Sequence, residues 1–257
     1  MSASRQAPRR SARPRSTALL AVLTLLGAFA LTAATMTSAQ ALRPVAAAAM
    51  TQGSPAPHAK SPRPVTSAVT FGVAEPGAPT DLSGVRTLTT QLGQAPSLVM
   101  WYVAWSSRTD FPSADVRAVA ASGATPEITW EPWDPASGAD QPAYRLAAIA
   151  NGAHDAYISR WAGQARAART PVVLRFGHEM NGSWYPWAEQ ANGNAPGDFV
   201  RAYRHVHDLF VAARATNVTW AWSPNVSFPG STPVSGLYPG DGYVDQVALT
   251  DTTGRHC

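Results

Sequence analysis

The sequence predicts an α/β protein with parallel strands, and three observations lead to that fold class. From about residue 67 to residue 249, short apolar runs alternate with segments whose apolar residues recur at helical spacing. Such alternation is typical of parallel strands joined by crossover helices. No glycine-rich loop joins a strand to a helix, which argues against a nucleotide-binding member of the class. Polar and aromatic residues also gather just after several apolar runs, where α/β barrels carry their chemistry.

Six apolar runs are expected to form the strands. They cover residues 68–73, 98–103, 125–130, 172–174, 218–222 and 243–249. The fourth run is the shortest, but it is uninterrupted and follows Pro171, as expected for a strand buried on both faces. The polar residues that follow it organise the rest of the interpretation.

Helical spacing marks the segments between these strands. The expected helices cover residues 82–92, 113–123, about 157–165 and 198–210. Ser113 and Asp198 suit the N-cap position, because their side chains can accept a hydrogen bond from a free backbone N–H. Gly123 suits a helix end. Residues 131–151 are rich in proline and glycine and are expected to form a long connection.

The amino-terminal segment matches a secretory signal. Five arginines precede residue 16, an apolar run covers residues 18–31, and Ala39-Gln40-Ala41 offers small residues for cleavage. The apolar run is short for a membrane span of about 20 residues, so a cleaved signal is favoured over a retained anchor. Residues 42–66 are rich in Pro, Ala and Ser and predict a disordered linker. The expected organisation is a signal in 1–41, a linker in 42–66 and an incomplete barrel domain in 67–257, secreted from the cell.

Composition excludes several classes of function. The net charge is +4, but the amino-terminal arginines account for it, so a nucleic-acid partner is not expected. Cys257 is the single cysteine, so no intrachain disulfide can form. His205 and His207 are the one close histidine pair, and they fall on different faces of an expected helix. We therefore expect no metal, no cofactor and, once the signal is removed, no membrane contact, in a monomer.

Tryptophan is abundant, with nine residues, and several follow the apolar runs. The apolar C–H face of a pyranose ring packs against an indole, while the sugar hydroxyls need polar partners nearby. Trp101 and Trp220 lie inside strands and are expected in the core. The tryptophans beyond the strand ends favour a sugar-binding surface over core packing. They are Trp105, Trp130, Trp133, Trp184, Trp187 and Trp222.

The residues around the end of the fourth strand form a recognisable family motif. Residues 175–187, Arg-Phe-Gly-His-Glu-Met-Asn-Gly-Ser-Trp-Tyr-Pro-Trp, closely resemble the signature of family 26 glycoside hydrolases. Residues 128–133 and 220–225 resemble the ends of strands 3 and 5 in that family, so the similarity covers about residues 68–249. The resemblance implies a (β/α)8 TIM barrel, of which only about six of eight β/α units are present. It also implies a retaining endo-β-glycosidase that acts on β-1,4-mannan or mixed-linkage β-glucan.

The resemblance assigns the role of general acid/base to Glu179. A lone Glu after a strand is usually solvated or ion-paired, but the polar and aromatic residues around this one favour catalysis. The expected substrate-binding residues are His178, Asn181, Trp184, Trp187, Trp133, Trp222, Asn225, Glu131 and Arg175. For His178, a neutral structural histidine is an equally good interpretation.

The second catalytic carboxylate is missing from the sequence. Retaining hydrolysis needs two carboxyl groups about 5–5.5 Å apart, and the family places its nucleophile, a Glu, at the end of strand 7. The chain has five Glu residues, none after Glu189. Asp241, Asp245 and Asp251 are poor substitutes, because the first two flank the start of the sixth strand, at the end opposite the active site, and the third lies in the terminal tail. We therefore expect the 257-residue chain to be inactive by itself.

The tail after Leu249 suggests a cause. The family continues its sixth strand with Asp-Gly-Tyr-Asn-Trp, whereas this chain has Thr-Asp-Thr-Thr-Gly in residues 250–254. A frameshift near Leu249 would explain the difference, because the same bases can encode the observed residues in one frame and Asp-Gly-Tyr-Asn-Trp in another. The downstream nucleotide sequence tests this hypothesis.

Two other classes of function stay open. A non-catalytic glycan-binding protein would use the same aromatic residues and would bind saccharides without cleaving them. A structural or anchored surface protein would bind no saccharide. Exchanging Glu179 for Gln separates catalysis from binding, because it removes the acidic proton and leaves the aromatic residues in place.

Overall fold

The computed structural model describes residues 70–251, which lie within one compact unit, Pro64–Cys257. The expected signal, the whole of the expected linker and Cys257 lie outside the described residues. The strands are β1 (Gly72–Val73), β2 (Leu98–Ala104), β3 (Thr125–Glu131), β4 (Val172–Phe176), β5 (Val218–Trp222) and β6 (Gln246–Val247). The helices are α1 (Ser83–Leu92), α2 (Ser113–Ala121), α3 (Leu146–Ala150), α4 (Asp155–Ala168) and α5 (Asp198–Ala212). Short 3-10 turns cover η1 (Pro135–Ser137), η2 (Pro142–Tyr144) and η3 (Val234–Gly236).

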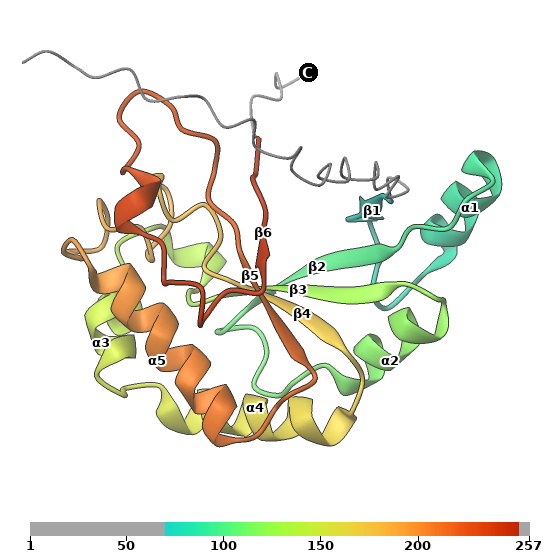
Figure 1. Ribbon diagram of the computed structural model, residues 1–257, viewed down its shortest axis with the longest axis horizontal. Helices are drawn as coiled ribbons and strands as arrows, with labels where there is room; N and C mark the ends of the chain where they lie inside the picture. Colours follow the sequence, from blue (N-terminus) through green and yellow to red (C-terminus); the bar gives the residue numbers. More distant parts are fainter. Residues whose placement is uncertain (1–69, 252–257) are drawn as a thin grey trace, which may run out of the picture. The chain divides into compact units, whose positions relative to one another are not determined.

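The six strands form one sheet in the order of the chain, and every neighbouring pair is parallel. Helices α2, α4 and α5 cover one face of the curved sheet (Figure 1). The fold is therefore a partial (β/α)8 barrel with six strands, as the sequence predicts. β6 is shorter than expected, although Thr250 still pairs with Asn225 beyond its end. A 3-10 turn, η3, takes the place of a crossover helix between β5 and β6.

Two helix starts differ from the expectation. Ser113 is the first residue of α2 and makes no capping hydrogen bond with its side chain. Asp198 likewise begins α5, and its carboxylate accepts from the N–H of Ala195 in the preceding loop at 2.9 Å. The cap of α5 comes from Glu189, whose Oε1 accepts from Gly197 N at 2.8 Å. A carboxylate at this end also complements the positive end of the helix dipole.

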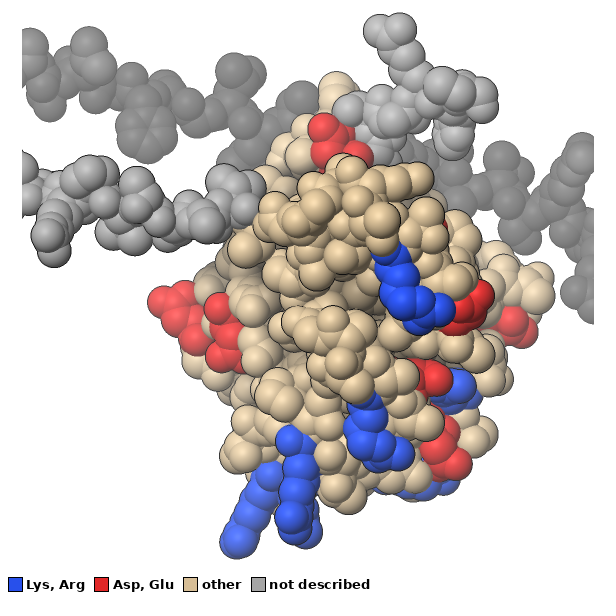
Figure 2. Space-filling model, turned by 90° about the vertical axis from the view of Figure 1, so that its right-hand side faces the viewer, with Lys and Arg blue, Asp and Glu red and all other residues tan. Residues whose placement is uncertain are grey.

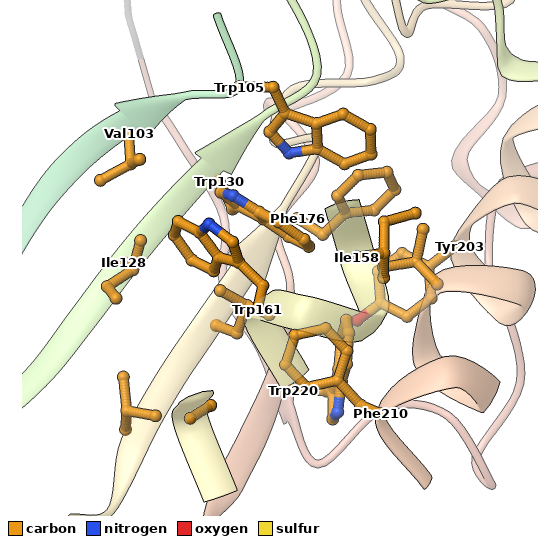
Figure 3. Packing of buried hydrophobic residues seen from close by; sticks show 14 of the residues in the cluster. Val103, Trp105, Ile128, Trp130, Ile158, Trp161, Phe176, Tyr203, Phe210 and Trp220 are labelled. Atoms are coloured by element: carbon orange, nitrogen blue, oxygen red, sulfur yellow. The ribbon is translucent and has the colours of Figure 1, made fainter. Parts of the chain in front are cut away.

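The hydrophobic core lies between the sheet and its helices. Trp130 on β3 stacks on Trp161 of α4, with ring centroids 4.5 Å apart, and Phe210 of α5 meets the same ring edge-on at 5.9 Å (Figure 3). Phe176 on β4 packs against Tyr203 of α5 at 5.9 Å. These rings exclude water from the helix-covered face, and this burial is the main source of the stability of the fold.

Alternate strand residues point to the opposite, concave side, which we call the inner face. In the sheet register Tyr102 lies beside Thr129, Thr129 beside Arg175 and Arg175 beside Ala221. Since side chains alternate along a strand, this row shares one face and the core tryptophans share the other. Trp101 and Trp220 are 6% and 4% exposed, so their expected place in the core is confirmed. Trp105 and Trp130 belong to the same core, so the expectation that they line a sugar-binding surface is wrong, because both rings pack against helix α4.

Charged side chains are sparse on the surface. Figure 2 views the molecule from the side of α1 and α2, where the described acidic and basic residues are intermixed over a mostly uncharged surface. Among residues 70–251, no helix combines the length and the apolarity that a membrane span requires.

Candidate active site

The candidate site begins where β4 ends. All five residues of β4 are buried, and the chain turns sharply at Gly177, whose φ is +55°. A Cβ at this position would lie 3.2 Å from the ring of Phe199 and 3.3 Å from that of Trp187. Glycine therefore allows both the left-handed turn and the close approach of the two rings.

Glu179 also has a left-handed backbone, with φ of +54°, which is uncommon for a residue other than glycine. Its N–H donates to the carbonyl of Ser223 at 2.7 Å, and its carbonyl accepts from Gly182 N at 3.0 Å. The residue is 5% exposed, and the indole N–H of Trp184 donates to its Oε2 at 3.0 Å. Such a conformation costs about 1–3 kcal/mol and persists only where neighbours hold it, most often at functional sites.

His178 and Glu131 meet beside Glu179. His178 Nδ1 lies 3.8 Å from Glu131 Oε1, and both side chains are under one-tenth exposed. Burial, with a smaller effect of the Arg175 charge, lowers the pKa of His178 to about 3. Burial raises the pKa of Glu131 to about 7, although the Trp133 N–H, 3.2 Å from Oε2, opposes that rise. His178 is therefore neutral, and the contact is not an ion pair at neutral pH.

A group of aromatic rings covers this pair. Tyr185 stacks on Trp187 with centroids 4.3 Å apart, and Trp133 meets both rings edge-on. Trp187 is completely buried, and its N–H donates to the carbonyl of His178 at 2.7 Å. Trp187 thus supports the Tyr185 ring from below and presents no face of its own to solvent. Burial, followed by the charges of Glu179 and Glu131, raises the pKa of Tyr185, so its phenol is neutral.

Asn181 and Asn225 join the loops that follow β4 and β5. The Asn181 amide donates to the carbonyl of Asn225 at 2.9 Å and accepts from its N–H at 2.8 Å. Trp222 is 7% exposed, and its indole N–H donates to the carbonyl of Leu237 at 3.1 Å. All three residues are buried, and their hydrogen bonds join the loops that carry the site.

Arg175 lies on the inner face of β4, just before the loop that carries Glu179. Its Nε donates to Thr129 Oγ1 at 2.8 Å and lies 3.4 Å from Glu127 Oε1. Its guanidinium carbon is 5.9 Å from the centroid of the Tyr102 ring. Burial raises the pKa of Glu127, and the Arg175 charge opposes this rise. Arg175 therefore supports the site from within the sheet.

The structure brings together His178, Glu179, Glu131, Trp133 and Trp184, all of which the sequence singles out. It adds Tyr102, Glu127 and Phe228, which the sequence analysis missed, and Tyr185, which lies in the family signature but was given no role of its own. The signal for Glu127 was present, because it alternates with Thr129 and Glu131 along β3 and so shares their face. In the described part of the chain, no group of three or more His, Cys, Asp or Glu residues is arranged to hold a metal ion.

Comparison with known proteins places this site in a family. The sequence profile of glycosyl hydrolase family 26 matches residues 123–255. Endoglucanase H of Acetivibrio thermocellus is 37% identical over 174 residues, which cover 65% of this chain and 18% of that protein. Mannan endo-1,4-beta-mannosidase A and B of Caldalkalibacillus mannanilyticus is 36% identical over 86 residues, 30% of this chain and 16% of that protein. The chain thus spans less than a fifth of the length of these curated relatives.

Solved structures agree on the fold. The Bacillus subtilis mannanase man26 aligns with a TM-score of 0.55 and 18% identity, covering 70% of this chain and 62% of that one. The β-mannanase from a symbiotic protist of the termite Reticulitermes speratus aligns with a TM-score of 0.52 and 19% identity, covering 70% and 63%. The family profile covers more than half of the sequence, including the strand ends that carry the candidate site. The chain therefore belongs to glycosyl hydrolase family 26.

Proposed function

We propose that the protein hydrolyses β-glycosidic bonds within a polysaccharide, β-1,4-mannan or mixed-linkage β-glucan, with Glu179 as general acid/base. The single observation that carries this proposal is the setting of Glu179: a buried carboxyl with a left-handed backbone at the end of a barrel strand. The C-terminal ends of barrel strands are where enzymes of this fold place catalytic groups. The relatives named as endoglucanase and mannosidase favour these two polysaccharides.

The geometry suits proton transfer to a bridging oxygen. The Trp184 N–H holds Glu179 Oε2 at 3.0 Å, which fixes the orientation of the carboxyl group. The proton would leave from the other oxygen, Oε1. Neutral His178 and Tyr185 can exchange hydrogen bonds with sugar hydroxyls without bringing a second full charge next to the acid, and burial raises the pKa of Glu131 to about 7.

Retaining hydrolysis also needs a carboxylate nucleophile on the other side of the anomeric carbon. The resemblance assigns this role to a Glu on a seventh strand, and the sheet of residues 70–251 ends at β6. We propose that the 257-residue chain binds saccharide without turnover, and that hydrolysis requires a form with the two further β/α units.

The test compares two variants in a form that carries both carboxylates. Exchanging Glu179 for Gln removes the proton that leaves with the departing sugar and should lower kcat about 10²–10⁴-fold with little change in binding. Glu189→Gln is the matched control, because Glu189 caps α5 and Gln keeps an acceptor oxygen for Gly197 N. Equal kcat values in the two variants would refute the assignment.

A non-catalytic glycan-binding function is the alternative. It is favoured by the exposed aromatic side chains beside Glu179, since Trp184 is 40% exposed. Under this alternative, Glu179→Gln leaves saccharide affinity almost unchanged, and no form of the protein releases reducing sugar.

We also propose that the protein is secreted, with a signal in residues 1–41 and a linker in 42–66. The pattern of arginines, apolar residues and small residues supports this. Amino-terminal sequencing of protein recovered from culture medium should find a start near residue 42, and a start at Met1 would contradict cleavage.

A further inference from the structure

Two large aromatic side chains are exposed together beside the candidate acid. Trp184, in the loop between β4 and α5, is 40% exposed, and Phe228, in the connection between β5 and β6, is 37% exposed. Their ring centroids are 5.6 Å apart and their planes differ by 27°, so the rings are stacked. We call this pair the aromatic ledge.

Trp184, the first ring of the aromatic ledge, is held in place from two sides. The Trp184 N–H is bonded to Glu179, and the indole lies on the backbone of Gly182. A Cβ at Gly182 would come within 2.5 Å of the indole carbons, so any side chain there would displace the ring. Trp184 therefore has a defined position relative to the carboxyl group.

Phe228, the second ring of the aromatic ledge, lies on a segment that is hydrogen-bonded to the loop after β4. Gln190 Nε2 donates to the carbonyl of Gly230 at 3.0 Å and to Thr232 Oγ1 at 2.8 Å. Thr232 N donates to the carbonyl of Asn181 at 2.8 Å. These bonds join the segment that carries Phe228 to the segment that carries Glu179, although the two lie about fifty residues apart in the sequence.

Packing alone is a poor explanation of the ledge. Rings that stabilise the fold, such as Trp130 and Trp161, are fully buried, whereas each ring of the ledge keeps more than a third of its surface in water. Stacking between two aromatic rings contributes only about 0.5–1.5 kcal/mol beyond burial. Exposed, oriented rings next to polar groups are what the C–H face of a pyranose requires.

We propose that Phe228 is a specificity-determining residue that contacts the sugar unit beyond the one on Trp184. The ligand is a β-linked hexose chain long enough to reach past Trp184, so affinity should rise when the chain covers both rings. This inference rests on the proposed function and deepens it, because it assigns a length preference to the same site.

The test measures dissociation constants of the 257-residue chain for trisaccharides and hexasaccharides. Both β-1,4-manno- and mixed-linkage gluco-oligosaccharides are used, with isothermal titration calorimetry as the readout. Phe228→Ala should weaken the binding of the better hexasaccharide roughly tenfold and change trisaccharide binding less than twofold. Val211→Ala, which truncates a 61% exposed residue on α5, is the control and should leave both constants unchanged.

Two further variants separate the ring from the loop. Phe228→Tyr keeps an aromatic face and should retain the hexasaccharide affinity, while Gln190→Ala frees the segment and should lower it partly. Thermal unfolding of each variant verifies that the fold persists. If Phe228→Ala weakens both ligands equally, or neither, the inference is overturned and saccharide binding still stands. If the unmodified chain binds no oligosaccharide, the proposed function falls as well.

Discussion

The two faces of the sheet are made from alternate residues of the same strands, yet they differ in nearly every physical property. The helix-covered face carries Trp130 and Phe176, which are fully buried among other rings. The inner face carries Arg175, Glu127 and Tyr102, which form an ion pair and a cation–π contact. One face contributes apolar burial, and the other contributes the charged support of the site.

This difference teaches how to interpret the tryptophans. Trp161 and Trp187 are both fully buried, whereas Trp184 is 40% exposed and is bonded to a candidate catalytic group. The residue type is the same, so only its face and its hydrogen-bond partner separate a structural indole from one that can meet a ligand.

The largest expected effect compares one aromatic residue from each face. Trp130→Ala should lower the free energy of unfolding by about 3–5 kcal/mol, because it leaves a cavity among rings that cannot close over it. Tyr102→Ala should cost less than about 1 kcal/mol, because the side chain is 55% exposed. Urea denaturation of both variants measures the difference, and similar losses would mean that the two faces are not distinct.

A double-mutant cycle on Arg175 and Glu127 sharpens the comparison. Arg175→Met should lower the free energy of unfolding by about 3 kcal/mol, because it leaves the partly buried Glu127 carboxyl without its cation. Adding Glu127→Leu should restore most of the loss, since a matched apolar pair replaces the ion pair. Additive losses in denaturant titrations would show that the two side chains are not coupled.

The smallest effect concerns pH. The pKa of Glu131 is about 7 in the folded chain against 4.5 for an ordinary Glu, so the folded state binds more protons between these values. The contribution of Glu131 to stability should therefore fall as pH rises from 4.5 through 7, by about 2 kcal/mol between about pH 5 and pH 8.

Glu131→Gln should remove this contribution, so that only the opposite contribution of His178 remains, and it keeps an acceptor for the Trp133 N–H. His178 has the opposite effect, because its lowered pKa makes the folded state bind fewer protons than the unfolded chain below pH 6.5. Melting temperatures of the unmodified chain and of Glu131→Gln across this range test both signs. An unchanged slope in the variant would exclude Glu131 as its source.

Much of the secondary structure could be predicted from the sequence alone. Apolar runs and helical spacing predicted the six strands and the main helices, because both signals depend on residues close together in the chain. The short α3, Leu146–Ala150, was missed, since five residues hold too little periodicity to distinguish a helix from a connection. The expected cap at Ser113 failed because the helix begins at Ser113 itself, which leaves Pro112, a residue without a side-chain acceptor, at the N-cap position.

The sequence by itself determined the parallel α/β order of the chain and the position of Glu179 at the end of the fourth strand. Only the tertiary structure decided that Glu131 faces His178, that Trp187 is buried beneath Tyr185, and that Phe228 stacks on Trp184. The physical reason is range: strand and helix patterns arise from neighbouring residues, whereas burial, pKa and ring contacts depend on which strand ends meet in space.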